Sequence, residues 1–201
     1  MLIVLFGLSG AGKSYVGRLL NQVAKVHYWE ADEALTEEFK QCISERKPLT
    51  QAIRDDYFSV VMPQINQLLK QHQHVVVSQA FYKNKNRQAM LKDFPETVFI
   101  KIEVDFPILV QRLQRRNSEV DYQFALQISK DFEEPEHAFY RVNNDTEKDV
   151  KSLLEQLQKV PEIKANLCFG TSRTDGLRLS FFGEEITDEA TSQTQNLQAK
   201  L

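Results

Sequence analysis

Near its amino terminus the chain reads Leu2-Ile-Val-Leu-Phe-Gly7-Leu-Ser-Gly-Ala-Gly-Lys-Ser14, an apolar run followed by a glycine-rich loop. Residues 7–14 fit the pattern GxxxxGK[ST] at every fixed position. The glycines let the backbone turn tightly, so that several N–H groups converge on phosphate oxygens. An amphipathic helix pattern follows, and its amino-terminal end attracts the same anion. This context favours a phosphate-binding loop over an ordinary glycine-rich turn.

The residues of this loop have predicted roles in binding a nucleotide. Lys13 would reach the β- and γ-phosphates and act in catalysis, and the Ser14 hydroxyl would coordinate Mg²⁺. We therefore expect ATP and Mg²⁺ as cofactors. The nucleotide-binding positions in the loop are Gly7, Ser9, Gly10, Ala11, Gly12, Lys13 and Ser14.

Composition excludes several classes of protein. With 42% hydrophobic and 26% charged residues, the 201-residue chain has the balance of a soluble globular protein. The formal net charge of -3 provides no electrostatic footprint for nucleic acid, so we expect no nucleic-acid partner. The longest apolar stretch, residues 1–8, is too short to span a membrane. The two cysteines, far apart, argue against a disulfide framework and for the cytoplasm.

Short β-branched or aromatic runs alternate with helical patterns, which predicts an α/β fold with a five-stranded, mainly parallel sheet and helices on both faces. The expected strands are Leu2–Phe6, Val26–Trp29, His74–Ser78, Val98–Ile102 and Ala138–Val142. The expected helices are Gly12–Val23, Ala34–Ser44, Gln51–His72, Lys85–Lys92, Pro107–Arg116, Asp121–Phe132 and Asp145–Val160. Pro63 should kink or split the third of these helices.

The character of the chain changes after Pro161. Leu167–Phe169 and Leu177–Phe181 flank Thr174-Asp175-Gly176, and an Asp-Gly pair between alternating runs predicts a β-hairpin. Residues from about 184 are polar and aperiodic, which is typical of a mobile tail. The expected organisation is a nucleotide-binding domain over residues 1–160, a hairpin extension over 161–183 and a tail over 184–201.

Two carboxylates follow the second expected strand, where ligands of parallel α/β sheets gather. Asp32 would serve as the base for an attacking hydroxyl or as a contact to Mg²⁺, and Glu30 would stand beside it on the substrate side. The alternative is that Asp32 only caps the helix that begins near Ala34.

Four arginines are further candidates. Arg54 and Arg87 would bind the substrate, although solvated helix surfaces also explain them. Arg112 would contact the nucleotide, and Arg116, at a polar break, would close over the transferring phosphate. The alternative for this second pair is favourable placement at a helix carboxyl terminus.

Taken in order, these segments resemble the gluconokinase family, one of the small P-loop kinases that also include shikimate and nucleoside-monophosphate kinases. Besides the loop, the similarity rests on weaker motifs over residues 1–160: Glu30-Ala31-Asp32, Lys47-Pro48-Leu49-Thr50 with Arg54, Asn86-Arg87-Gln88-Ala89-Met90-Leu91 and Phe132-Glu133-Glu134-Pro135. The resemblance implies a P-loop NTPase fold, a small-molecule acceptor and a homodimer. This chain departs from the family pattern on the acceptor side, where Ala80-Phe81-Tyr82-Lys83 replaces the family's Ser-Ala-Leu-Lys.

We therefore expect an ATP-dependent kinase that phosphorylates a hydroxyl of a sugar acid such as gluconate. One alternative keeps the fold and changes the acceptor to a nucleotide, a nucleoside or a shikimate-like compound. Another is an ATP-binding regulatory module without transferase activity, because the departures fall on the acceptor side.

Overall fold

The computed structural model describes residues 1–115, 122–145 and 149–169. Over these residues it contains a five-stranded sheet of order β2-β3-β1-β4-β5, in which every neighbouring pair is parallel. The strands are β1 (Leu2–Phe6), β2 (His27–Glu30), β3 (Val75–Ser78), β4 (Val98–Glu103) and β5 (Tyr140–Asn143). All five lie within two residues of their predicted bounds, so the predicted α/β fold with a parallel sheet is confirmed.

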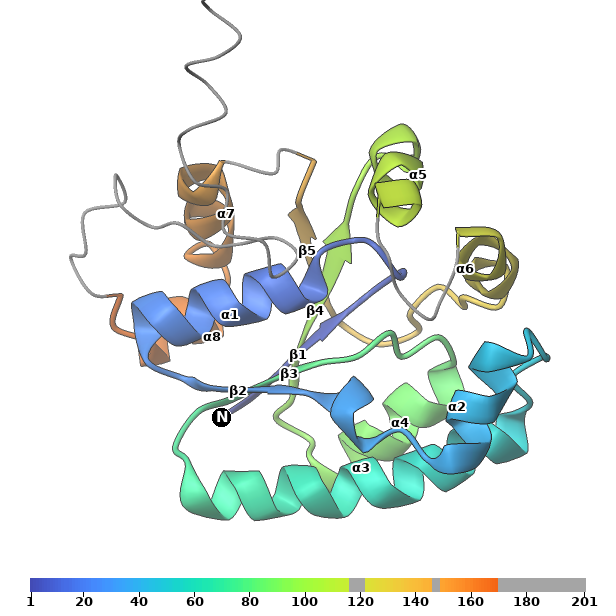
Figure 1. Ribbon diagram of the computed structural model, residues 1–201. Coiled ribbons are helices and arrows are strands. Elements are labelled where there is room, and N and C mark those ends of the chain that lie inside the picture. Colours follow the sequence, from blue (N-terminus) through green and yellow to red (C-terminus); the bar gives the residue numbers. More distant parts are fainter. Residues whose placement is uncertain (116–121, 146–148, 170–201) are drawn as a thin grey trace, which may run out of the picture.

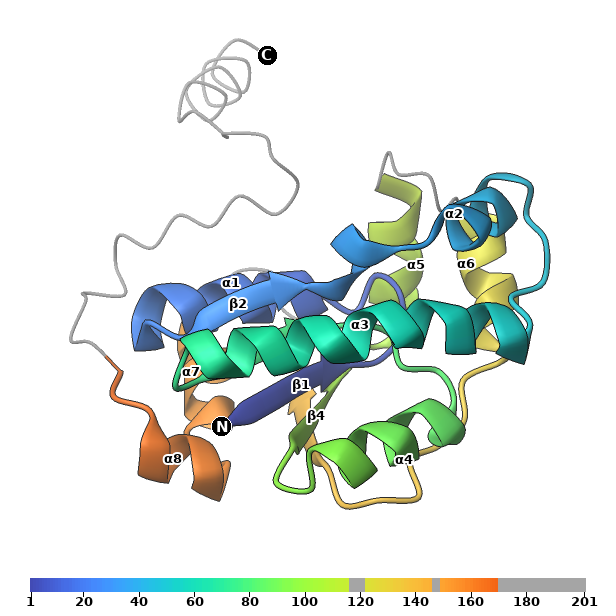
Figure 2. The ribbon, with the colours of Figure 1, turned by 90° about the horizontal axis from the view of Figure 1, so that it is seen from below.

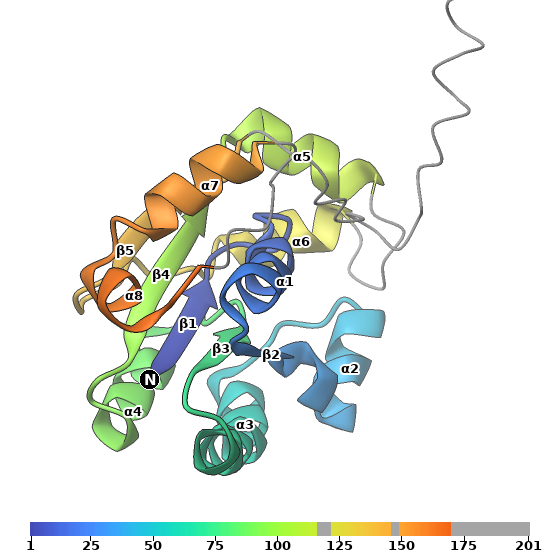
Figure 3. The same ribbon diagram turned by 90° about the vertical axis from the view of Figure 1, so that its left-hand side faces the viewer.

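Helices cover both faces of the sheet. Helices α1, α7 and α8 lie on one face, and α3 and α4 lie on the other (Figures 1 and 2). The pair α5 and α6 lies at the end of the sheet toward which the strands point (Figure 3). The bounds are α1 (Lys13–Ala24), the 3₁₀ helix η1 (Ala31–Ala34), α2 (Glu37–Ser44), α3 (Gln51–Gln71), α4 (Asn84–Asp93), α5 (Phe106–Arg115), α6 (Tyr122–Ser129), α7 (Val150–Leu157) and α8 (Pro161–Asn166).

The central strand β1 is buried on both faces. Successive side chains of a strand point to opposite sides. Ile3 and Leu5 accordingly pack in the cluster that includes α1 and α7, whereas Val4 and Phe6 pack in the cluster that includes α3. Burial on both sides explains why β1 is an unbroken apolar run rather than an alternating one.

Helix α3 corrects one part of a prediction, because it is not split at Pro63 and continues as one helix from Gln51 to Gln71. A proline inside a helix removes one backbone hydrogen bond and costs about 3 kcal/mol. Its neighbours Val61 and Ile65 are fully buried against the sheet, whereas Pro63 itself is exposed. Burial of this apolar stripe offsets the proline, since packing supplies most of the stability of helices in proteins.

The region after residue 160 differs in part from the prediction. It begins with α8, which the sequence pattern did not indicate, and whose Ile163 is fully buried in the cluster that contains β1. Leu167–Phe169, the expected first arm of the hairpin, is neither helix nor strand. The rest of the hairpin and the tail lie outside the described residues, and the boundary at residue 160 stays a prediction.

Candidate active site

The phosphate loop joins β1 to α1 and depends on its glycines. Gly7 has φ 135° and Gly12 has φ 93°, backbone conformations that other residues rarely adopt. A Cβ atom on Gly7 would lie 2.6 Å from the Ile102 carbonyl oxygen, and one on Gly12 would lie 2.1 Å from Nδ2 of Asn144. Both positions therefore require glycine for conformation and for space.

Lys13 begins α1 and folds back over the loop. Its Nζ donates hydrogen bonds to the carbonyl oxygens of Gly7 at 3.1 Å and of Leu8 at 2.9 Å. The ammonium group thus lies beside the loop and the amino-terminal end of α1, which also favours negative charge. The phosphate-binding role of Lys13 itself stays a prediction.

Ser14 contacts the end of β2. Its hydroxyl donates a hydrogen bond to Oε1 of Glu30, and the other carboxylate oxygen of Glu30 lies 3.7 Å from Nη1 of Arg18. A hydroxyl and a carboxylate are the oxygen ligands that Mg²⁺ prefers, and Mg²⁺ uses few protein ligands when phosphates supply the rest. Sequence reasoning assigned the metal contact to Asp32, but the structure places Glu30 against Ser14.

Asp32 lies in η1, just beyond β2, and its carboxylate is oriented by Gln79. Nε2 of Gln79 donates hydrogen bonds to Oδ1 of Asp32 at 2.9 Å and to the Tyr57 hydroxyl at 2.8 Å. The Tyr57 hydroxyl in turn donates to the Ala31 carbonyl oxygen at 2.8 Å. Burial, with a contribution from Asp32, raises the pKa of Tyr57, which keeps its phenol neutral.

Two points follow from this arrangement around Asp32. The Thr36 side chain accepts a hydrogen bond from the backbone N–H of Phe39 and caps α2, so Asp32 does not serve as that helix cap. Gln79 was missed by sequence reasoning, although its position directly after a buried strand, at the carboxyl edge of the sheet, was a usable signal.

Arg54 is buried in the first turn of α3, with 5% of its surface exposed. Its Nε donates to the Leu49 carbonyl oxygen at 3.2 Å, and its Nη2 forms an ion pair with Oδ2 of Asp131 at 3.2 Å. The guanidinium lies 5.5 Å from the centre of the Tyr82 ring. Arg54 therefore links α3 to the segment after α6, and it is not the solvated surface arginine of the alternative reading.

Arg87 is fully buried and its guanidinium is directed into the protein. It donates hydrogen bonds to the Phe81 carbonyl oxygen, to Oδ1 of Asn84 and, at 2.6 Å, to the Glu133 carbonyl oxygen. It also lies 5.5 Å from the centre of the Phe132 ring. Sequence reasoning expected Arg87 to bind the substrate. In the structure it instead ties α4 to the segment that leaves α6.

Arg112 lies behind the phosphate loop, with 2% of its surface exposed. Its Nη2 donates to the Asn144 carbonyl oxygen at 2.8 Å, and Nδ2 of Asn144 donates to the Ala11 carbonyl oxygen at 2.9 Å. The predicted nucleotide-side arginine is thus placed next to the loop. Arg116, the other predicted arginine of this region, lies outside the described residues.

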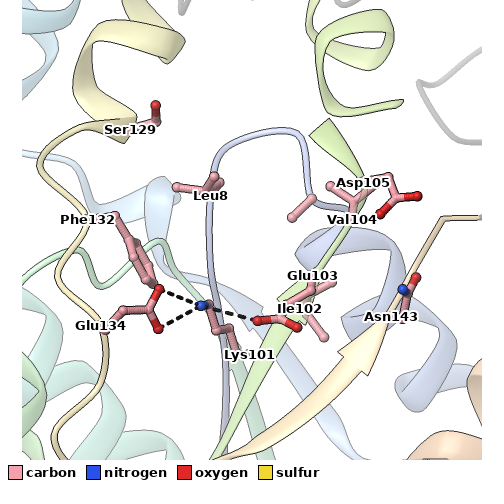
Figure 4. A pocket seen from close by; sticks show the side chains of 11 residues that line it. Leu8, Lys101, Ile102, Glu103, Val104, Asp105, Ser129, Phe132, Glu134 and Asn143 are labelled. Carbon is pink, nitrogen blue, oxygen red and sulfur yellow. Dashed lines mark hydrogen bonds and ion pairs between the residues drawn. The ribbon is translucent and has the colours of Figure 1, made fainter. Parts of the chain in front are cut away.

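A cavity of about 450 Å³ opens beside the phosphate loop, between Leu8 and Ser129 at the end of α6 (Figure 4). Lys101 at its base forms ion pairs with Glu134 at 3.1 Å and with Glu103 at 3.2 Å (Figure 4). The cavity therefore separates the loop from the segment that follows α6, and its lysine is already neutralised by carboxylates.

Neither a clustered metal-binding site nor a membrane-crossing helix is present in the part of the chain that the structure describes. Residues 1–115, 122–145 and 149–169 contain no group of three or more His, Cys, Asp or Glu side chains arranged to hold a metal ion. In the same part of the chain, no helix combines the length and the apolar character that crossing a membrane requires.

The fold and the site together define a small P-loop kinase: a parallel sheet, a phosphate loop after β1, and carboxylates at the end of β2 and just beyond it. The model of the shikimate kinase family matches residues 9–160. The chain belongs to this family and is therefore a small-molecule kinase, and kinases of the family use ATP.

Several solved structures share this fold. A sugar kinase from Janibacter sp. HTCC2649 is 17% identical with a TM-score of 0.67, over 79% of this chain and 92% of that one. A gluconokinase from Sinorhizobium meliloti 1021 is 23% identical with a TM-score of 0.65, over 81% and 94%. A shikimate kinase from Bacteroides thetaiotaomicron is 17% identical with a TM-score of 0.54, over 81% and 98%. No curated protein matches the sequence.

Proposed function

We propose that this protein transfers the γ-phosphoryl group of ATP to a hydroxyl of a sugar acid such as gluconate. The observation that carries the proposal is the Asp32 carboxylate, oriented by Gln79 at 2.9 Å. The segment that contains Gln79 runs beside the phosphate loop, because the Gly7 N–H donates to the Ala80 carbonyl oxygen at 3.4 Å. An oriented carboxylate beside the phosphate loop suits the activation of an attacking hydroxyl.

Phosphoryl transfer requires positioning and charge neutralisation more than covalent chemistry. Lys13 would neutralise the β- and γ-phosphates, and Ser14 with Glu30 would hold Mg²⁺, which supplies further positive charge. Arg112 would border the nucleotide, and Arg116 would neutralise the phosphoryl group in transfer. These assignments are part of the proposal.

The acceptor side favours a hydroxylated carboxylic acid. Arg54 is a buried cation whose planar guanidinium suits a carboxylate, which would share it with Asp131. The similarity to a gluconokinase supports gluconate as the acceptor. Shikimate, also a hydroxylated carboxylic acid, is the second candidate, because the shikimate kinase family model covers residues 9–160.

The test is ADP release from Mg·ATP with a panel of sugar acids, shikimate, nucleosides and nucleoside monophosphates. Lys13→Ala provides the background rate. Stimulation by gluconate or another sugar acid well above that background supports the proposal. Stimulation by shikimate alone or by nucleosides alone identifies the acceptor and removes the sugar acid. ATP binding without stimulation by any acceptor would instead indicate a regulatory module.

The role of Asp32 is tested separately with the acceptor that the panel identifies. Asp32→Asn should lower kcat by about 10²- to 10⁴-fold, the usual contribution of a general base. The affinity for ATP should stay unchanged. Glu33→Gln is the matched control, since it removes an exposed carboxylate from the adjacent position. Equal effects of the two substitutions would contradict the assignment.

A further inference from the structure

Tyr82 lies where three parts of the site meet. It follows β3, and its carbonyl oxygen accepts a hydrogen bond from the Glu133 N–H at 2.9 Å. Its ring packs edge-on against Phe132, with ring centres 5.7 Å apart, and the Arg54 guanidinium lies 5.5 Å from the ring centre. The side chain is buried, with 5% of its surface exposed.

The hydroxyl of Tyr82 is buried and has no hydrogen-bond partner among the residues that the structure describes. Ser9 of the phosphate loop is close enough to lower the pKa of Tyr82, but it does not reach hydrogen-bond geometry. Burial dominates and raises this pKa, so the phenol stays protonated near neutral pH. A buried hydroxyl without a partner costs free energy, and such groups in native structures call for an explanation.

The surroundings of the hydroxyl indicate what would satisfy it. Ser9 belongs to the loop whose backbone N–H groups cradle phosphate oxygens. Arg54 and Asp32, the charged groups that also act on Tyr82, belong to the acceptor side. The part of ATP that must lie between the loop and the acceptor is the terminal phosphoryl group. Its anionic oxygens are strong acceptors for a neutral O–H donor.

We propose that Tyr82 donates a hydrogen bond to a γ-phosphate oxygen of ATP and so distinguishes ATP from ADP. This inference rests on the ATP-dependent transfer proposed above and is independent of the acceptor. It also concerns a feature in which this chain differs from the gluconokinase pattern, where Leu stands in the position of Tyr82. A leucine there has no group that could make this bond.

The experiment compares Tyr82→Phe with the unchanged protein, because this substitution removes one oxygen atom and keeps the ring. Calorimetry measures the binding of the non-hydrolysable ATP analogue AMP-PNP and of ADP, each with Mg²⁺. Affinity for AMP-PNP should fall about tenfold, as expected for a lost hydrogen bond to a charged group, and affinity for ADP should not change. The melting temperature without nucleotide should not fall, since the hydroxyl has no partner to lose.

Two control variants accompany the comparison of Tyr82→Phe with the unchanged protein. Tyr140→Phe removes a hydroxyl that contacts Glu162, away from the phosphate loop, and should leave both affinities unchanged. Tyr57→Phe removes a hydroxyl that is hydrogen-bonded to Ala31 and Gln79, and should lower the melting temperature.

The other outcomes overturn the inference. Unchanged affinity for AMP-PNP in Tyr82→Phe, with or without a raised acceptor KM, excludes the γ-phosphate contact. Equal losses for AMP-PNP and ADP, or a lower melting temperature, indicate a structural hydroxyl. If the unchanged protein binds neither nucleotide, the proposed function fails as well. If it binds AMP-PNP through Tyr82 but no sugar acid stimulates turnover, only the proposed acceptor fails.

Discussion

The Ser14 hydroxyl donates a hydrogen bond to Oε1 of Glu30 and so joins the first turn of α1 to the end of β2. Helix α1 follows β1, and β1 is not a neighbour of β2 in the sheet, since β3 lies between them. The contact brings a carboxylate to the residue that coordinates Mg²⁺ in phosphate loops of this pattern. We therefore propose Glu30 as the carboxylate beside the metal and Asp32 as the carboxylate beside the acceptor.

Glu30→Gln tests this division of roles. The amide oxygen still accepts from Ser14, but the negative charge beside the metal is lost. The Mg²⁺ concentration for half-maximal kinase activity should rise about 10-fold, in the range seen when groups next to metal ligands are changed. Binding of metal-free ATP should not weaken. Glu162→Gln on α8 is the control, and an equal Mg²⁺ requirement in both variants would contradict the role of Glu30.

Arg87→Met tests whether Arg87 is structural. The substitution leaves the carbonyl oxygens of Phe81 and Glu133 without their buried donor. The free energy of unfolding in urea should fall by on the order of 3 kcal/mol. Arg141→Met, at a half-exposed arginine paired with Glu103, should cost less than about 1 kcal/mol. Unchanged stability of Arg87→Met with a raised acceptor KM would restore the substrate-binding role.

Pro63→Ala should stabilise the protein. Alanine restores a backbone donor in the middle of α3 and fits an exposed position without new contacts. The gain in the free energy of unfolding should be about 2 kcal/mol, which is the helix penalty of proline reduced by the flexibility it removes from the unfolded chain. Gln67→Ala, also exposed on α3, should change stability by less than about 0.5 kcal/mol. A loss of stability in Pro63→Ala would show that the proline conformation is required.

Protonation of His137 should lower the free energy of unfolding in mild acid. Burial is the largest effect and lowers the pKa of His137 below its ordinary 6.5; the hydrogen bond with the Ala138 carbonyl opposes it, and the charge of Arg87 adds a smaller lowering. The unfolded state therefore binds a proton more readily than the folded state. The stability due to neutral His137 is complete above the unfolded pKa and is lost as the pH falls toward the folded pKa.

The measurement is urea unfolding at pH 7 and at pH 5 for the unchanged protein and for His137→Phe. Phenylalanine keeps an aromatic ring beside Phe99, whose ring centre lies 4.3 Å from that of His137. The variant should lose less stability than the unchanged protein between the two pH values. Equal losses in both would show that other groups, such as Glu133 with its lowered pKa, account for the acid sensitivity.

Some features of the site were predictable from local pattern and others were not. The position of Lys13 and Ser14 in a glycine-rich loop between β1 and α1 was predictable because the loop geometry depends on nearby glycines, and their roles toward a nucleotide stay predictions. Gln79 and the burial of Arg87 were not predicted, since their partners are distant in sequence. Nothing in the residues around Arg87 distinguishes an arginine that reaches a ligand from one that bonds to Glu133, 46 positions away.

The sequence by itself determined the phosphate loop, the strands and the class of chemistry, because these depend on backbone conformation and on apolar runs that are read locally. Only the tertiary structure decided that Glu30 contacts Ser14, that Gln79 orients Asp32 and that Tyr82 keeps an unpaired hydroxyl. These relationships follow from the strand order β2-β3-β1, which places the carboxyl end of β2 beside that of β3 and next to the loop after β1. Strand order is set by the packing of the whole chain, so the residues that share the site meet only in the folded protein.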